Sequence, residues 1–203
     1  KKSHLLEAAL VAAVDHGPQA PSIAAARMSA TCGVDINNSL ATGINMLGDI
    51  HGGAGQQALE LYIDIQTKGI ENLNQIINDY KKLNNGFIPG FGHRFHKLGD
   101  PRTPRLLDLV DNAVIDGEVS GKFIKIGRQI EKELSNKKTI PMNIDGATAV
   151  IYAELGCPPP LARGLFCLSR SVGILAHTWE QMQQGERIKG PTPPDYKWDY
   201  KGK

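Results

Sequence analysis

Gly90-Phe-Gly-His-Arg-Phe-His-Lys-Leu-Gly-Asp-Pro-Arg102 is the most informative stretch of this 203-residue chain. His93 follows two closely spaced glycines there, and five ionisable side chains come after it within nine residues. Glycine lets a backbone approach a ligand closely, and imidazole exchanges protons near neutral pH. The basic residues suit a polyanionic ligand, such as a phosphate-bearing cofactor or a carboxylate-rich acid. A solvated, charged surface loop explains the same residues equally well.

The sequence on both sides of this stretch has helical periodicity. Apolar residues recur at intervals of three and four, as at Leu161, Leu165, Leu168 and Val172, which is the spacing of one helix face. The pattern predicts helices over residues 5–13, 21–31, 35–47, 54–67, 70–84, 103–117, 120–134, 145–155 and 161–184. The proline triplet at 158–160 predicts a break before the last of them. No strand alternation with hairpin residues stands out, so the expected fold class is all-α.

The composition is typical of a soluble globular protein, with 41% hydrophobic and 22% charged residues. A net charge of +2 gives no support for nucleic-acid binding. Cys32, Cys157 and Cys167 are far apart and form no Cys-x-x-Cys pair. That pattern argues against a disulfide framework or a zinc site and favours a reducing compartment. We therefore expect a cytoplasmic location.

The N-terminal residues resemble a secretory signal only superficially. Glu7 interrupts the apolar run, and Asp15-His16-Gly17 stands where a cleavage site would lie. No run reaches the ~18 apolar residues that a membrane span needs, so no membrane association is expected. Because the chain begins with Lys1 rather than Met, we expect further residues to precede it.

Three other polar residues stand at positions suited to chemistry. His51 precedes a glycine-rich turn that opens a helix, where a neutral imidazole could donate a hydrogen bond to a developing enolate oxygen. Asp145 lies among apolar residues, where burial would raise its pKa and make it a candidate general base. His16 follows the end of a predicted helix. The plainer readings are a helix-terminal cap for His16, a loop histidine for His51 and a helix N-cap for Asp145.

Arg170 lies in the middle of the last predicted helix, which is apolar on almost every face. Such a helix is buried in a core or a subunit interface, and a buried arginine needs an anionic partner. That partner is either a carboxylate of the protein or a substrate carboxylate held bidentately. Lys137 and Lys138 form a basic pair upstream of Asp145, which is either solvated or in contact with a phosphate.

Five motifs together resemble the citrate synthase family, especially its short citryl-CoA lyase branch and the related C-terminal module of ATP-citrate lyase. They are DHG at 15–17, HGGA at 51–54, PGFGHRFHKLGDPR at 89–102, NIDG at 143–146 and LSRSVGILAH at 168–177. They run in the family order at family-like spacings and cover most of the chain. The third motif is highly specific, whereas HGGA and NIDG gain weight only within the series.

The resemblance implies a role for each candidate residue. His51 would hydrogen-bond the thioester carbonyl, and Asp145 would move the proton at the acetyl methyl carbon. His93 would exchange a proton with the carbonyl or hydroxyl oxygen of the oxaloacetate-derived part. Three residues would hold the carboxylates and oxygen of that part: His16, Arg102 and Arg170. The loop around residues 91–97, with a basic pair downstream, would supply the coenzyme A contacts: Phe91, Gly92, Arg94, Lys97, Lys137 and Lys138.

The activity implied by the resemblance is formation or cleavage of the carbon–carbon bond of citryl-CoA, from or to acetyl-CoA and oxaloacetate. The alternative is a citrate or 2-methylcitrate synthase. The coenzyme A thioester would be a substrate, and no metal or redox cofactor would be required. A third possibility is a non-catalytic, CoA-binding oligomerisation module. It is disfavoured because His51, His93 and Asp145 are all retained.

The implied architecture has a large helical domain, residues 1–54 and 161–203, and a smaller helical domain, residues 55–160. The large domain would carry the interface of a homodimer, and the smaller one would close over coenzyme A. One segment departs from the family: Arg187 and Lys189 are out of register with the basic Ile-Arg-Pro-Arg-like element of the synthases. This departure and the shortness of the chain favour the lyase over the synthase.

Overall fold

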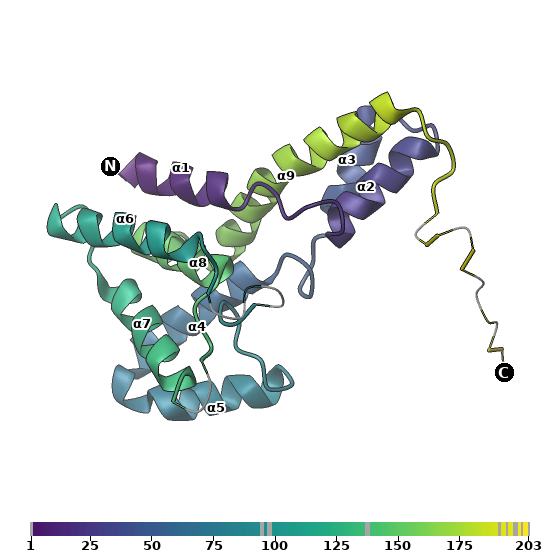
Figure 1. Ribbon diagram of the computed structural model, residues 1–203. Helices are drawn as coiled ribbons and strands as arrows, with labels where there is room; N and C mark the ends of the chain where they lie inside the picture. Colours follow the sequence, from purple (N-terminus) through teal and green to yellow (C-terminus); the bar gives the residue numbers. More distant parts are fainter. Residues whose placement is uncertain are drawn as a thin grey trace. The chain divides into compact units, whose positions relative to one another are not determined.

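The structure is a computed structural model that describes residues 2–93, 96, 99–136, 139–190, 192–193, 195–196, 199 and 201–202. Within these ranges the chain is helical and has no strand (Figure 1), which confirms the predicted fold class. The helices are α1 Lys2–Ala12, α2 Pro21–Thr31, α3 Ile36–Asn45, α4 Ala54–Lys68, η1 Ile70–Asn72, α5 Leu73–Leu83, α6 Thr103–Ile115, α7 Lys122–Leu134, α8 Ile144–Glu154 and α9 Pro159–Gln184.

The predicted helices are all present, with ends displaced by a few residues. The predicted break before the last helix is present, because α8 ends at Glu154, but α9 already begins at Pro159, inside the proline triplet, rather than at Leu161. Proline is tolerated in the first turn of a helix because the N–H group that it lacks has no intrahelical partner there. The alternative interpretation of Asp145 as a helix N-cap is wrong, since Asn143 is the N-cap of α8 and Asp145 lies in its first turn.

The chain divides into two compact units, which are described separately. Unit 1 comprises residues 1–14 and 48–169, and unit 2 comprises residues 15–47 and 170–203. These units do not share the boundaries of the large and small domains expected from the resemblance, and that functional division stays a prediction.

The core of unit 1 forms where α4 and α8 pack against each other. Buried side chains on α4 include Tyr62 and Ile65, and they meet Val150 and Ile151 of α8 in one apolar cluster. Helices α1, α6 and α7 also pack on α8. This packing fixes the N-terminal ends of α4 and α8, and both of these ends carry motif residues.

Unit 2 has a smaller core, formed by Ile23 and Ala26 of α2 with Ile174 of α9. Helix α3 packs closely on α2 because Gly43 lacks a side chain. A Cβ atom at Gly43 would lie 2.7 Å from the side chain of Ile174 and 2.8 Å from the carbonyl oxygen of Ser22. The backbones of these helices can approach only with glycine at this position.

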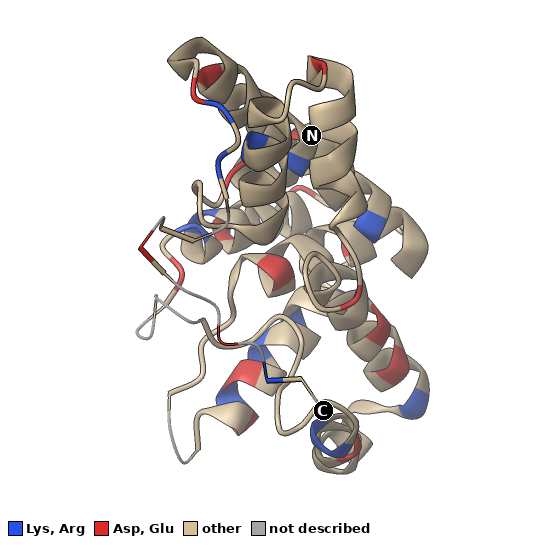
Figure 2. Cartoon of the chain, turned by 90° about the vertical axis from the view of Figure 1, so that its right-hand side faces the viewer, with Lys and Arg blue, Asp and Glu red and all other residues tan. Residues whose placement is uncertain are grey.

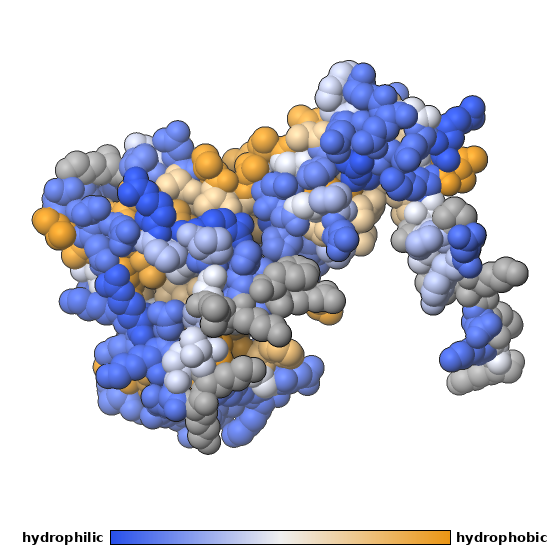
Figure 3. Space-filling model, in the orientation of Figure 1, coloured by the Kyte–Doolittle hydropathy of each residue, from blue (hydrophilic) through white to orange (hydrophobic). Residues whose placement is uncertain are grey.

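Helix α9 is not buried all round in the single chain. Apolar surface is visible along it in Figure 3, and Leu168, Val172 and Trp179 are 60%, 57% and 56% exposed. The sequence predicted burial in a core or in a subunit interface, and of these the interface remains as a prediction. No helix among the described residues is long and apolar enough to cross a membrane. Acidic and basic residues alternate along many of the helices in the cartoon of Figure 2.

Candidate functional site

His51 lies in a tight loop that leads into the N-terminus of α4. The N–H of Gly48 donates to the carbonyl oxygen of His51 at 2.8 Å, which closes the loop. Gly53 must be small, because a Cβ atom there would lie 2.4 Å from the carbonyl oxygen of Asp49. The side-chain amide of Gln57 donates to that same carbonyl at 3.0 Å. The HGGA glycines therefore place a half-buried histidine directly before a helix N-terminus.

Asp145 lies in the first turn of α8, and its carboxylate faces the first turn of α4. A Cβ atom built on Gly55 would lie 4.0 Å from Oδ1 of Asp145. Gly55 is the second residue of α4, which begins immediately after the His51 loop. The side chain of Asp145 is half-buried rather than enclosed. The motifs HGGA and NIDG thus meet at two packed helix N-termini within unit 1.

The glycine-rich stretch before His93 crosses the same helix ends. A Cβ atom on Gly90, whose φ is +85°, would lie 2.8 Å from Cα of Gly146 and 2.9 Å from Cβ of Ala58. Phe91 and Met142 form an isolated antiparallel bridge. The backbone of the His93 loop therefore lies directly on the first turn of α8. This close approach is the structural reason for Gly90 in one motif and Gly146 in the other.

Asn143 connects the His93 loop to α8 with its side chain. Its amide nitrogen donates to the carbonyl oxygen of Gly92 at 2.6 Å. Its amide oxygen accepts from the backbone N–H groups of Asp145 and Gly146, at 2.9 and 3.2 Å. Its own backbone N–H donates to the carbonyl oxygen of Gly90 at 3.0 Å.

The ring of His93 is oriented by His96. The backbone N–H of His96 donates to Nδ1 of His93 at 3.0 Å, and the two rings lie 4.6 Å apart between centroids. Because a backbone N–H can only donate, Nδ1 is the acceptor and the neutral ring carries its proton on Nε2. His93 therefore carries the proton of its neutral ring on Nε2 in this structure.

Arg102 is held by Asp100, whose side chain is fully buried. Nε and Nη2 of Arg102 donate to the two carboxylate oxygens at 2.9 and 2.8 Å, and Nη1 donates to the carbonyl of Ala12 at 3.1 Å. Asp100 also accepts from the N–H of Ile144, the first residue of α8, at 3.3 Å. Burial raises the pKa of Asp100, but the N–H groups of Arg102 and Ile144 outweigh it and lower the pKa to about 2. The carboxylate is therefore ionised and fixes the guanidinium.

A cavity of about 720 Å³ opens beside His93. Its lining is mainly apolar and includes Phe91 and Gly92, two of the residues for which a coenzyme A contact stays a prediction. Phe87, which is 76% exposed, and Lys81 lie on the same lining. The lining is completed by residues from the α5 end, from α7 and from the segment before α8: Gly86, Ile88, Leu134, Thr139, Ile140 and Pro141.

His16 and Arg170 belong to unit 2. Arg170 is buried, with 5% of its surface exposed, and His16 is exposed in the turn after α1, which ends at Ala12. His16 therefore lies beyond the last turn of α1, whereas the interpretation as a helix-terminal cap placed it at the end of the helix. The role of both residues in holding substrate carboxylates stays a prediction.

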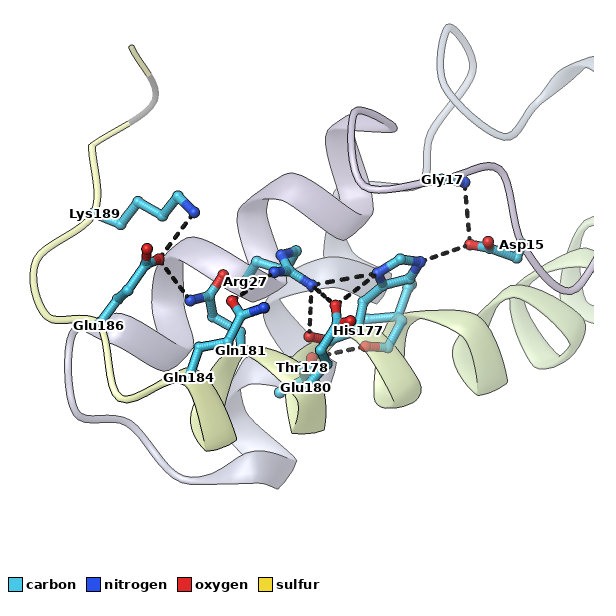
Figure 4. A network of polar contacts seen from close by, with 11 residues as sticks. Asp15, Gly17, Arg27, His177, Thr178, Glu180, Gln181, Gln184, Glu186 and Lys189 are labelled. Carbon is cyan, nitrogen blue, oxygen red and sulfur yellow. Dashed lines mark hydrogen bonds and ion pairs between the residues drawn. The ribbon is translucent and has the colours of Figure 1, made fainter. Parts of the chain in front are cut away.

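The residue next to His16 belongs to a network of polar side chains in unit 2 (Figure 4). Nε2 of His177 lies 3.1 Å from the carboxylate of Asp15, and Nδ1 lies 3.4 Å from Nη1 of Arg27. Arg27 also pairs with Glu180 and donates to Gln184 at 3.0 Å. Burial raises the pKa of Asp15, but the N–H groups of Gly17 and His16 and then His177 outweigh it and lower that pKa overall.

The structure thus brings together His51, His93, Asp145 and Arg102 on adjoining segments of unit 1. Four predicted coenzyme A contacts lie outside the described residues: Arg94, Lys97, Lys137 and Lys138. Among the residues that are described, no group of three or more His, Cys, Asp or Glu side chains could hold a metal ion. Lys189, which is out of register with the basic element of the synthases, pairs with Glu186 of the same chain at 2.9 Å.

Two residues with central positions were missed by sequence reasoning. Asn143 was quoted within a motif, and Asp100 was quoted within the DPR triplet, but neither received a role. A signal was present for Asn143, since asparagine two residues before a helical aspartate is a preferred N-cap. The bonds to Gly92 and Ile144 depend on tertiary contacts, and no local pattern predicts them.

Comparisons with known proteins identify the family of the chain. The chain matches the model of the family described as citrate synthase, C-terminal domain, over residues 1–192. It is 29% identical over 194 residues to the citrate synthase of Saccharolobus solfataricus, covering 92% of this chain and 50% of that protein. It is 32% identical over 183 residues to citrate synthase 2 of Bacillus subtilis, covering 89% and 48%. The chain spans about half the length of these curated relatives.

The structure is also similar to that of citryl-CoA lyase from Hydrogenobacter thermophilus. The TM-score is 0.85 with 31% sequence identity, and the match covers 100% of this chain and 77% of that chain. A helical fold with the family's motifs at packed helix ends defines the class, and the chain belongs to the citrate synthase family. The resemblance drawn from the five motifs is thereby confirmed.

Proposed function

We propose that this chain makes or breaks the carbon–carbon bond of citryl-CoA, with cleavage to acetyl-CoA and oxaloacetate as the favoured direction. The observation that carries the proposal is the junction at the N-terminus of α8. There the loop of His93 is bonded through Asn143 to the turn of Asp145, and the Asp145 carboxylate faces the helix that follows His51. Two proton carriers and a hydrogen-bond donor are the groups that a reversible aldol-type cleavage needs.

In the cleavage direction, His93 accepts the proton of the citryl hydroxyl group as the carbon–carbon bond breaks. The electron pair of that bond passes to the thioester, which becomes an enolate. His51 donates a hydrogen bond to the enolate oxygen. Asp145, protonated at the start, returns a proton to the enolate carbon and completes the methyl group of acetyl-CoA. Condensation follows the same steps in reverse, and each positioned acid or base typically contributes ~10²–10⁴-fold.

The direction of cleavage is supported by two observations. The citryl-CoA lyase from Hydrogenobacter thermophilus matches the whole of this chain. Arg187 and Lys189 do not reproduce the basic element of the synthases, and Lys189 is paired with Glu186. These observations favour cleavage without bearing on the acyl group of the thioester.

One specific observation favours the alternative, a citrate or 2-methylcitrate synthase. The N–H of His96 holds Nδ1 of His93 as an acceptor, so that Nε2 carries the ring proton. That tautomer suits donation to a ketone oxygen, which condensation requires. Cleavage requires Nε2 to accept a proton, and the bond from His96 must then open so that Nδ1 takes the ring proton.

The mainly apolar cavity beside His93 is our candidate for part of the coenzyme A site. It adjoins the glycine-rich loop, so that a thioester entering through it would reach His93, which is part of its lining. Lys81 supplies a positive charge on its lining for a phosphate group. Assembly as a homodimer and a cytoplasmic location belong to the same proposal.

Two assays of the purified protein in its full natural length test the function. One follows oxaloacetate formation from citryl-CoA, and the other follows thiol release from acetyl-CoA plus oxaloacetate. We expect turnover in the first assay to exceed that in the second. Coenzyme A binding without turnover in either assay would instead support a non-catalytic module and would overturn the proposal.

Substitution of the proton carriers tests their roles. His93→Ala and Asp145→Ala should each lower kcat at least ~10²-fold while the urea midpoint of unfolding changes little. The control is His4→Ala, since His4 is exposed on α1. Turnover close to that of the unmodified protein in either variant would remove that residue from the mechanism.

A further inference from the structure

Asn143 uses its side chain in two directions at once. Its amide oxygen caps α8 by accepting from the N–H of Asp145, and its amide nitrogen donates to the carbonyl of Gly92, the residue before His93. The bond to Gly92, at 2.6 Å, is the shorter of the two. A single planar amide therefore joins the residue preceding one proton carrier to the backbone of the other.

This bonding pattern requires both the donor and the acceptor of an amide. An aspartate would cap the helix equally well, since Asp and Asn are similarly favoured at that position. It has no N–H group, however, and its second oxygen would face the Gly92 carbonyl. A serine at position 143 would also cap the helix, but its shorter side chain could not bond the N–H of Asp145 and the carbonyl of Gly92 at once. Capping and bridging can therefore be separated by substitution.

We propose that Asn143 is a positioning residue that fixes the His93 loop relative to Asp145, an inference that rests on the proposed function. The two proton carriers act on opposite ends of the bond that is made or broken. Reacting groups must be held within about 0.5 Å of the productive geometry, and an error near 1 Å can cost ~10²-fold in rate. The Asn143 amide supplies this constraint between the loop and the helix.

The test separates the bridge from the cap. Asn143→Asp keeps the cap and removes the bridge, so kcat should fall by ~10²-fold while KM for the thioester stays within ~3-fold. The urea midpoint of Asn143→Ser, which keeps a cap and brings no second oxygen toward the Gly92 carbonyl, should remain close to that of the unmodified protein. Asn143→Ala removes both bonds and should lower the urea midpoint as well as kcat. If N143D does not fold, Asn143→Ser carries the same expectation as N143D.

A matched control is Asn72→Asp. Asn72 stands at the N-cap of α5 and donates from its amide to the carbonyl of Lys68 at 2.6 Å, on the exposed surface. The Asn72→Asp variant loses a comparable hydrogen bond, and its kcat should equal that of the unmodified protein. A kcat of N143D within ~3-fold of the unmodified protein, at equal stability, would overturn the positioning role. Absence of turnover in the unmodified protein would overturn the proposed function instead.

Discussion

The junction around Asn143 in unit 1 and the network around His177 in unit 2 fix histidines by different means. In the junction, Nδ1 of His93 accepts from a backbone N–H group. In the network, Nδ1 of His177 faces the guanidinium of Arg27, which can only donate, so the proton again lies on Nε2. Both rings therefore have the same tautomer, one set by the backbone and the other by a charged side chain.

The carboxylates of the two regions also differ in their exposure to solvent. Asp100, which ties Arg102 to the N-terminus of α8, has a fully buried side chain. The side chains of Asp15 and Glu180 in the network are 44% and 59% exposed. Solvent and salt screen exposed charges far more than buried ones. Removing the buried charge from the junction should therefore cost much stability, and changes in the network should cost little and depend on salt.

The largest effect on stability is expected for Gly90→Ala. Gly90 has a φ of +85°, and a Cβ atom there would lie 2.8 Å from Cα of Gly146 and 2.9 Å from Cβ of Ala58. Left-handed strain costs ~1–2 kcal/mol and overpacking ~1–3 kcal/mol, so we expect a loss of about 4 kcal/mol. Urea denaturation followed by circular dichroism would measure it.

Gly86→Ala separates the two contributions. Gly86 has a φ of +88°, but no atom lies within 4 Å of the position that its Cβ would take. It should therefore cost only the strain, ~1–2 kcal/mol. Equal losses in the two variants would show that the His93 loop does not lie on α8 as closely as described.

The fold was predictable from the sequence because its signals are local. The spacing of apolar residues follows from which helix face is buried, and it can be read within each helix. The motif residues His51, His93 and Asp145 were predicted as site residues from the glycines beside them and from the resemblance to the citrate synthase family. The order of the motifs also predicted their convergence, which the structure supports for the residues of unit 1.

The contacts that position these residues were not predictable, because they join segments distant in sequence. Nothing local indicates that the Asn143 amide reaches Gly92 or that Asp100 accepts from Ile144. Arg102 was interpreted only as a substrate ligand, although Asp100 lies two residues before it. A local ion pair of this kind was visible in the sequence, whereas its burial at a helix N-terminus was not.

An intermediate effect is expected for Asp100→Asn. The folded-state pKa of Asp100 is about 2, below its ordinary value of 3.8. A depressed pKa stabilises the fold above the ordinary value, and this contribution is lost as the pH falls from near 4 toward 2. The shift corresponds to roughly 2 kcal/mol at pH 7, so the stability difference between the two proteins should be of that size there and should narrow below pH 4.

Asp111→Asn is the matched control for the buried position. Asp111 also binds an arginine, Arg128, through both carboxylate oxygens, but the two side chains are 38% and 48% exposed. An exposed pair of this kind contributes ~1 kcal/mol or less. A loss for D100N no larger than that for D111N would contradict the role of Asp100 as a buried link between Arg102 and α8.

The smallest effect is expected for His177→Gln, in the network of unit 2. His177 contacts the half-exposed carboxylate of Asp15, with Arg27 and Glu180 as its other charged neighbours. We expect a loss of ~1 kcal/mol or less in dilute buffer, and a smaller loss near 1 M NaCl, where the screening length falls to about 3 Å. The loss for D100N should persist at that salt concentration, because Asp100 is buried. A loss for H177Q as large and as independent of salt as that for D100N would mean that charged surface contacts fix unit 2 as firmly as the backbone and buried carboxylate fix the junction.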